Sequence, residues 1–177
     1  MAVMATSGCG VLPGDAGEPR TLAKIDGWRS GLVTPPQVFS ALEIAYNSQI
    51  AQRMWEENVS PDLPAQDGDP VRVGVYGDLD SVDFDEQAVA LWSGGQSGSC
   101  PGWLSGVRLA EATHVIVTED SDSGVSGACT ADRNVYRAVV VIDREQLPSE
   151  QGLASAYATD DDVEYFAEVF LTAYPAA

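Results

Sequence analysis

The sequence predicts an α+β domain in which an antiparallel, hairpin-rich β-sheet is preceded by one long N-terminal helix and followed by a C-terminal helix, with one disulfide bond. Apolar residues recur at spacings of three and four between 35 and 57, which is typical of an amphipathic helix. Between 71 and 143, short Val-rich stretches follow one another without an intervening helical pattern. This order favours an antiparallel sheet over a parallel βαβ arrangement.

The N-terminal residues resemble the end of a bacterial lipobox, in which a peptidase cuts ahead of a cysteine whose sulfur carries diacylglycerol. Thr6, Ser7 and Gly8 are small residues directly before Cys9. Thr6 stands where a lipobox usually has Leu, and the basic and apolar parts of a signal peptide are missing, so we expect the true start to lie upstream. The alternative is an incidental cysteine in a frayed terminus.

The following residues, 10–20, combine Gly, Pro and acidic side chains and are typical of a linker. We therefore expect 1–20 to be a partial lipobox and flexible linker, and 21–177 to be a single α+β domain. A short strand with a turn at Asp26 and Gly27 begins this domain.

The long helix is predicted over 35–57. Thr34 is suited to the N-cap and Pro35 to the first turn. Asn58 and Pro61 end the pattern. The apolar side chains that form its stripe are Phe39, Leu42, Tyr46, Ile50 and Met54.

The strands are predicted at 71–76, 88–92 and 135–143, with a hairpin formed by Val107–Leu109 and Val115–Val117. At the C-terminus, Thr159 or Asp160 would cap a helix whose first turn is acidic. Val163, Phe166 and Phe170 would lie on one of its faces. The end of this segment, "VFLTAY", also fits an extended strand.

The chain is strongly acidic, with 27 acidic and 9 basic side chains and a formal net charge of −18. This balance excludes nucleic acid and anionic lipid surfaces as partners, because both need Lys and Arg to neutralise phosphate. We expect membrane contact only through a lipid anchor. The acidity is explained most simply by solubility, and the alternative is a site for calcium or another cationic ligand.

The acidic run "DLDSVDFDE" does not meet the requirements of an EF-hand loop. Counted from Asp78, Val82 stands at position five and Asp83 at position six, where an oxygen ligand and a glycine are needed. We predict solvated turns here, and neither a metal site nor a cofactor.

The cysteines Cys100 and Cys129 flank the predicted hairpin. An antiparallel hairpin returns its two ends to one place, so these residues can reach the separation that a disulfide requires. Closing a loop of this size should stabilise the fold by about 3–4 kcal/mol. Metal ligation is disfavoured because the chain has one His, and a Cys–His nucleophile is disfavoured because His114 lies in an apolar strand.

Two motifs around these cysteines carry a resemblance. The first runs from Trp92 through "SGSCP" to Pro101, and the second is "CTAD", which contains Thr130 and Asp132. Together they are similar to a group of uncharacterised exported proteins of actinobacteria, many regarded as lipoproteins. The resemblance covers roughly 70–148 and implies a cell-envelope location and a disulfide, but no reaction.

Aromatic side chains on or beside the predicted strands allow two interpretations. Trp92, Trp103, Tyr76 and Tyr136 could form a row that binds sugar or peptide, or they could pack in the core. Trp103 could also cover the disulfide. No catalytic motif is present, and we predict no catalytic residue.

We therefore predict a lipid-anchored extracytoplasmic protein, more an interaction domain than an enzyme, whose ligand is an envelope polymer or a protein. The alternative is a secreted hydrolase that uses Asp or Glu residues. The sequence does not fix the oligomeric state.

Overall fold

The computed structural model describes residues 17–29, 40–111, 114–122, 128–155, 157–159 and 168–176. The elements, in chain order, are β1 (Arg20–Asp26), β2 (Ser40–Ala45), α1 (Ser48–Asn58), β3 (Gly74–Val75), η1 (Leu79–Ser81), β4 (Gln87–Gln96), β5 (Gly102–Glu111), β6 (His114–Ser121), β7 (Asn134–Asp143), η2 (Arg144–Gln146), η3 (Glu150–Ser155), β8 (Tyr157–Thr159) and β9 (Glu168–Ala173).

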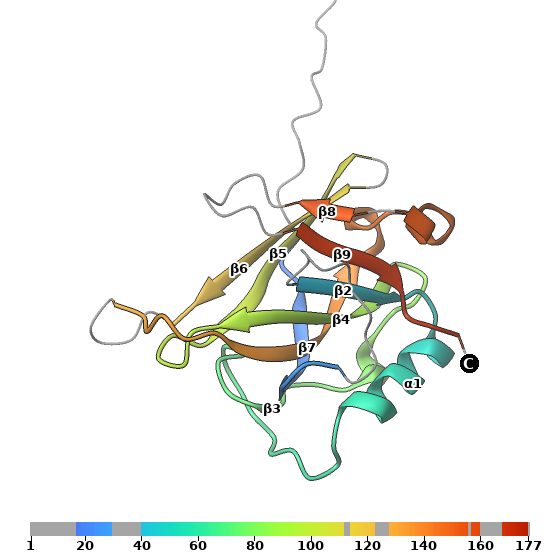
Figure 1. The fold of residues 1–177 in the computed structure, drawn as a ribbon. Coiled ribbons are helices and arrows are strands. Elements are labelled where there is room, and N and C mark those ends of the chain that lie inside the picture. Colours follow the sequence, from blue (N-terminus) through green and yellow to red (C-terminus); the bar gives the residue numbers. More distant parts are fainter. Residues whose placement is uncertain are drawn as a thin grey trace, which may run out of the picture.

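The strands form a seven-stranded mixed sheet and a separate two-stranded hairpin (Figure 1). The order in the large sheet is β3-β1-β7-β4-β2-β9-β8, and β5 pairs with β6. All pairs are antiparallel except β2 and β9, which run parallel with Leu42 opposite Leu171. The predicted antiparallel sheet is therefore confirmed in its main part, with one parallel pair added.

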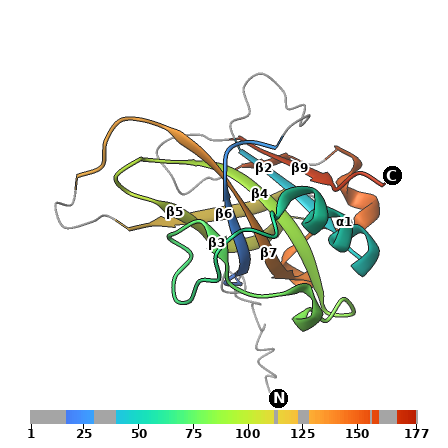
Figure 2. The same ribbon diagram turned by 90° about the horizontal axis from the view of Figure 1, so that it is seen from below.

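The central strand β4 is covered on both faces. Its residues Ala88, Ala90 and Trp92 belong to a core cluster that contains Leu104 and Val117 of the hairpin. Its alternate residues pack instead in a second cluster with α1. Because successive side chains of a strand point to opposite faces, the hairpin and α1 cover opposite sides of the sheet (Figure 2).

The helix α1 begins at Ser48 and is preceded by the N-cap Asn47. The side-chain oxygen of Asn47 accepts a hydrogen bond from the backbone N–H of Ile50 at 2.9 Å. Ala51 and Met54 face the sheet and are fully buried. None of the helices that the described residues form is long and apolar enough to cross a membrane.

The prediction of a long helix over 35–57 is wrong for most of its first half. Residues Ser40–Ala45 form β2, and only Ser48–Asn58 are helical, while 35–39 lie outside the described residues. All six residues of β2 are buried because the strand is central. A strand covered on both faces loses its alternation, and here its apolar residues happened to continue the helical spacing of α1.

The predicted C-terminal helix is wrong where the structure describes it. Residues Glu168–Ala173 form β9, and Thr159, one of the two proposed caps, is the last residue of the strand β8. Asp160, the other proposed cap, and the first turns up to 167 lie outside the described residues. Val169 and Leu171 are buried while Phe170 is half-buried, which is the alternation of a strand. The extended alternative for "VFLTAY" is confirmed.

The remaining strand predictions are confirmed with one reduction. The strands at 21–26, 88–92 and 135–143 and the hairpin are all present, and most are longer than expected. The strand at 71–76 shrinks to β3, because the preceding backbone is engaged elsewhere: the N–H of Arg72 donates to the hydroxyl of Tyr76.

Candidate functional site

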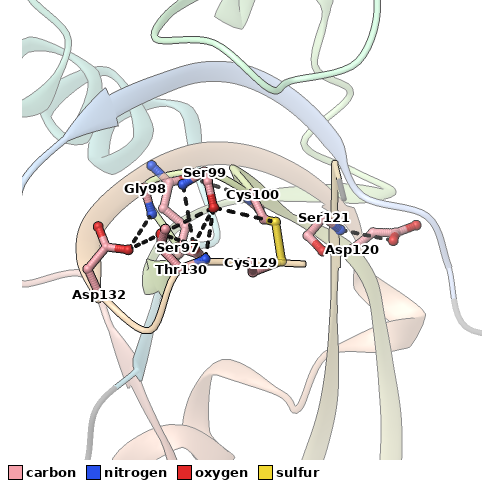
Figure 3. The surroundings of a disulfide bond; sticks show 11 residues. Ser97, Gly98, Ser99, Cys100, Asp120, Ser121, Cys129, Thr130 and Asp132 are labelled. Atoms are coloured by element: carbon pink, nitrogen blue, oxygen red, sulfur yellow. Dashed lines mark hydrogen bonds between the residues drawn. A yellow bond between two sulfur atoms is a disulfide. The ribbon is translucent and has the colours of Figure 1, made fainter. Parts of the chain in front are cut away.

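The disulfide between Cys100 and Cys129 is present, as the cysteine positions predicted. The two Cα atoms are 5.5 Å apart and the sulfur atoms 2.10 Å apart. Cys100 lies two residues before the start of β5 and Cys129 follows β6, so the bond closes the open end of the hairpin (Figure 3). A disulfide of this kind is typical of proteins outside the cytoplasm, so the bond indicates an extracytoplasmic protein.

The two sequence motifs meet at this bond and form what we call the disulfide clasp: Ser97, Ser99, Cys100, Cys129, Thr130 and Asp132. The backbone N–H of Thr130 donates to the hydroxyl of Ser99 at 2.8 Å. The hydroxyls of Ser97 and Thr130 lie 2.9 Å apart. Figure 3 shows these side chains converging from the two segments on one side of the disulfide.

Asp132 closes the clasp from the "CTAD" side. Its carboxylate accepts hydrogen bonds from the hydroxyl of Thr130 and, at 3.3 Å, from the backbone N–H of Gly98. These bonds, led by the one from Thr130, lower the pKa of Asp132 below its ordinary value. The residue is exposed, so the effect is to hold an ionised acceptor between the segments rather than to create a reactive group.

Gly94 and Gly98 of the "SGGQSGSC" segment lie where an added Cβ would meet another side chain. A Cβ on Gly94 would lie 2.6 Å from Nε1 of Trp92 and 2.8 Å from Oε1 of Glu119. A Cβ on Gly98 would lie 2.5 Å from a carboxylate oxygen of Asp132. The Gly-rich composition therefore makes room for side chains that reach across from the hairpin and from the segment that precedes β7.

Trp92, Glu119 and Tyr136 form a hydrogen-bonded group that we call the buried network. The indole N–H of Trp92 donates to Oε1 of Glu119 and to the hydroxyl of Tyr136, each at 3.0 Å. The hydroxyl of Tyr136 in turn donates to Glu119. These bonds join β4 and β7 of the sheet to β6 of the hairpin.

The carboxylate of Glu119 turns inward although the residue lies on an exposed part of β6. Burial of this carboxylate raises its pKa, and the hydrogen bonds from Tyr136 and Trp92 oppose the shift. Burial and the neighbouring Glu119 raise the pKa of Tyr136 well above its ordinary value, so the phenol stays protonated and continues to donate.

Lys24 extends the connection between the layers and is 1% exposed. Its ammonium donates to the carbonyl of Gly102 at 2.7 Å and to that of Val71 at 3.0 Å, and it lies 4.8 Å from the ring centroid of Tyr136. Burial lowers the pKa of Lys24 to about 8, against the opposing influence of Asp26 and Glu119. Sequence reasoning missed this residue, although a single Lys inside the apolar stretch "TLAKI" was an available signal.

A second feature, which we call the aromatic depression, brings Trp103 and Tyr76 together. Both side chains are half-buried, and they line a cavity of about 300 Å³. No indole hydrogen bond of Trp103 is found within the part of the chain that the structure describes. The full lining is Glu18, Pro19, Arg20, Thr21, Asp67, Gly68, Asp69, Pro70, Tyr76, Trp103, Leu104 and Ser105.

The four aromatic residues singled out in the sequence therefore divide into two pairs. Trp92 and Tyr136 are in the core, 1% and 0% exposed. Trp103 and Tyr76 lie at the aromatic depression, whereas the groove beside the disulfide is lined by other residues, among them Gln96 and Asp120. Pro101 is half-buried, and its carbonyl accepts the N–H of Asp122 at 3.0 Å.

The remaining candidates do not assemble into a reactive centre in the described part of the chain. His114 stands at the turn end of the hairpin, and the cysteines close the opposite end. Asp78 caps η1, its side chain accepting the N–H of Ser81 at 3.1 Å. No group of three potential metal-binding side chains occurs among the described residues, and Cys9 lies outside them.

No family model, curated protein or solved structure matches this chain.

Proposed function

We propose that this protein is an exported, lipid-anchored binding domain that stands at the outer face of the cell envelope and holds a hydroxyl-rich envelope polymer in its aromatic depression. The extracytoplasmic part of the proposal is supported by the Cys100–Cys129 disulfide. The anchor is supported by the small residues before Cys9 and by the linker composition that follows.

The binding role is supported by one observation: Trp103 and Tyr76 line the same surface depression, which acidic side chains also border. Flat aromatic faces pack against the apolar side of a sugar ring, and an indole N–H remains available as a donor. Glu18, Asp67 and Asp69 supply carboxylate oxygens that accept hydrogen bonds from sugar hydroxyls. The net negative charge of −18 favours a neutral polymer over an anionic one.

Binding is tested by co-sedimentation of the full chain with purified cell-wall polysaccharide. Trp103→Ala should weaken binding by about tenfold or more, since an aromatic anchor in a small site commonly contributes that much. Trp55→Ala is the matched control: Trp55 is also half-buried but lies on α1, away from the depression. Equal binding by wild type and Trp103→Ala would contradict the proposal.

The salt dependence of binding separates a polymer from a basic peptide. Three carboxylates and one guanidinium, that of Arg20, line the depression. A Lys- or Arg-rich peptide would therefore bind electrostatically and lose affinity as salt is raised. A neutral glycan should bind almost equally at low and high salt. Strong loss of binding at high salt would indicate that the ligand is a basic protein and not a glycan.

The lipid anchor is tested separately by feeding cells a clickable fatty acid. Protein expressed from the gene with its upstream region should be labelled, and Cys9→Ala should remove the label. Absence of label on the wild-type protein would refute the anchor without affecting the binding experiment.

The hydrolase alternative gains no support from the described carboxyl groups. Glu119 is the one among them whose pKa is raised, and its oxygen already accepts hydrogen bonds from Trp92 and Tyr136. This arrangement holds the hairpin on the sheet.

A further inference from the structure

Three of the nine basic residues gather at one place on the helix side of the sheet. The guanidinium groups of Arg29 and Arg53 lie 5.0 and 5.7 Å from the ring centroid of Tyr174. Arg137 joins them through Asn58, whose amide donates to the Tyr174 hydroxyl at 3.1 Å. Arg29 and Arg137, but not Arg53, line a cavity of about 290 Å³, which we call the arginine pocket. Its lining is Trp28, Arg29, Glu57, Asn58, Arg137 and Tyr174.

Two of these cations are neutralised by carboxylates. Arg29 donates through two nitrogens to the carboxylate of Glu43, which is 1% exposed, with a closest distance of 2.7 Å. Arg53 lies 3.4 Å from a carboxylate oxygen of Glu57. Glu43 therefore neutralises Arg29. Glu57, which lines the pocket, is paired with Arg53 outside it and accepts a hydrogen bond from the hydroxyl of Tyr174.

Arg137 differs because its partners are neutral. It donates to the side-chain oxygen of Asn58 at 2.6 Å, to the carbonyl of Gly27 at 2.9 Å and more weakly to that of Asp26 at 3.4 Å. No carboxylate among the described residues forms an ion pair with it. A guanidinium has five N–H donors, so two remain available in a group whose position is fixed by the other three.

The surroundings of Arg137 disfavour an isolated cation. Burial, together with the charge of Arg29, lowers the pKa of Arg137 below its ordinary value, although Tyr174 opposes this. An unpaired charge removed from water is costly, and a bound anion would offset that cost.

Two further donors lie beside Arg137. Trp28 lines the pocket, is half-buried, and its indole N–H finds no partner within the described ranges. Ser93 stands directly opposite Arg137 in the β4–β7 register and so shares its face of the sheet. Ser93 is fully buried, and its hydroxyl is unpaired among the described residues.

We propose that the arginine pocket binds a carboxylate, with the free donors of Arg137 forming the charged contact and the indole of Trp28 contributing an N–H and a flat apolar wall. A fixed guanidinium fork matches the two oxygens of a carboxylate. The cavity admits a small organic acid or the free C-terminus of a peptide. This site is separate from the aromatic depression and does not depend on the polymer-binding proposal.

The test is an NMR titration of the full chain, in which the indole N–H of Trp28 and the Nε–H of Arg137 are followed. The probes are benzoate, its neutral counterpart benzamide, N-acetylphenylalanine and inorganic phosphate. Benzoate and N-acetylphenylalanine should shift both signals and benzamide should not. The tighter of the two carboxylates identifies the source, a free acid or a peptide C-terminus.

Arg137→Gln should weaken carboxylate binding about tenfold or more, which is the usual effect of losing a hydrogen bond to a charged group. Arg72→Gln removes the same charge from an exposed loop residue and should leave binding unchanged. If Arg137→Gln does not fold, Trp28→Phe, which removes the indole donor alone, should still weaken binding several-fold. Equal binding of benzamide, unchanged binding in Arg137→Gln and Trp28→Phe, or tighter binding of phosphate than of both carboxylates would overturn the proposal.

Discussion

Trp92 and Trp103 stand on either side of Cys100 in one Gly-rich stretch, yet they occupy opposite kinds of environment. Trp92 is in the core and its indole N–H has two acceptors, Glu119 and Tyr136. Trp103 lies half-buried at a surface depression. The difference shows that one aromatic motif serves two purposes: its first part fastens the hairpin to the sheet, and its second part presents a surface.

This comparison predicts that truncating the two tryptophans will have very different costs. Trp92→Ala should reduce the free energy of unfolding by about 3–5 kcal/mol, because it leaves a large core cavity and unpaired acceptors. Trp103→Ala should reduce it by less than about 1 kcal/mol, as is usual at the surface. Urea denaturation of both variants measures the contrast, and equal losses would show that Trp103 is also a core residue.

The disulfide clasp should contribute nearly as much stability as Trp92. Cys100→Ser combined with Cys129→Ser should reduce the free energy of unfolding by about 3–4 kcal/mol, because the unfolded chain regains the freedom of an open loop. Reduction of the wild-type protein should produce the same loss and serves as the control. A loss below about 1 kcal/mol would mean that the hydrogen bonds of the clasp suffice without the covalent link.

Substitution of Gly94 and of Gly98 compares the stability contributions of the buried and the exposed part of the same motif. Gly94→Ala should cost about 1–3 kcal/mol, since its Cβ would overlap Trp92 and Glu119 in the buried network. Gly98→Ala should cost less than about 1 kcal/mol, because the overlapping atoms belong to the exposed side chains of Asp132 and Asn134, which can move. Thermal unfolding compares the two, and the reverse order would contradict this account of the network.

The smallest expected effect is a pH dependence of the free energy of unfolding that comes from Lys24. Its pKa in the folded protein is about 8, below its ordinary value, so the unfolded chain binds the proton more tightly. Stability should therefore rise as pH increases from about 8 to 10. The neighbouring Tyr136 opposes this only above its ordinary pKa of 10.0, because burial raises its pKa in the folded state.

Urea denaturation across this pH range measures the expected rise. Lys24→Met has no titrating amine at this position and should show a flatter profile. An equal rise in the variant would assign the pH dependence to other groups.

Local patterns predicted the hairpin, β1, β4, β7 and the disulfide, because alternation and cysteine position are properties of short segments. They did not predict β2, whose neighbours β4 and β9 are distant in the sequence and cover it completely. Glu43 also conceals this strand in the sequence, because acidic residues are usually exposed, whereas here the carboxylate is buried and paired with Arg29. A signal for the true helix start is present in Asn47, which is the N-cap and belongs to a residue type favoured at that position.

The two sites were predictable to different degrees. The clasp could be predicted because both cysteines and both motifs can be seen in the sequence. The arginine pocket could not, because Arg29, Asn58, Arg137 and Tyr174 come from four separate segments that only the sheet brings together. The roles of Glu119 and Lys24 depend likewise on which side chain faces which layer.

The most direct test of the account is the state of Cys100 and Cys129 in protein taken from living cells. Cells are treated with an alkylating reagent before lysis, and the peptides containing the two cysteines are analysed by mass spectrometry with and without reduction. The structure predicts one linked peptide pair that becomes alkylated only after reduction. Recovery of both cysteines as alkylated, unlinked peptides without reduction would contradict both the clasp and the extracytoplasmic location.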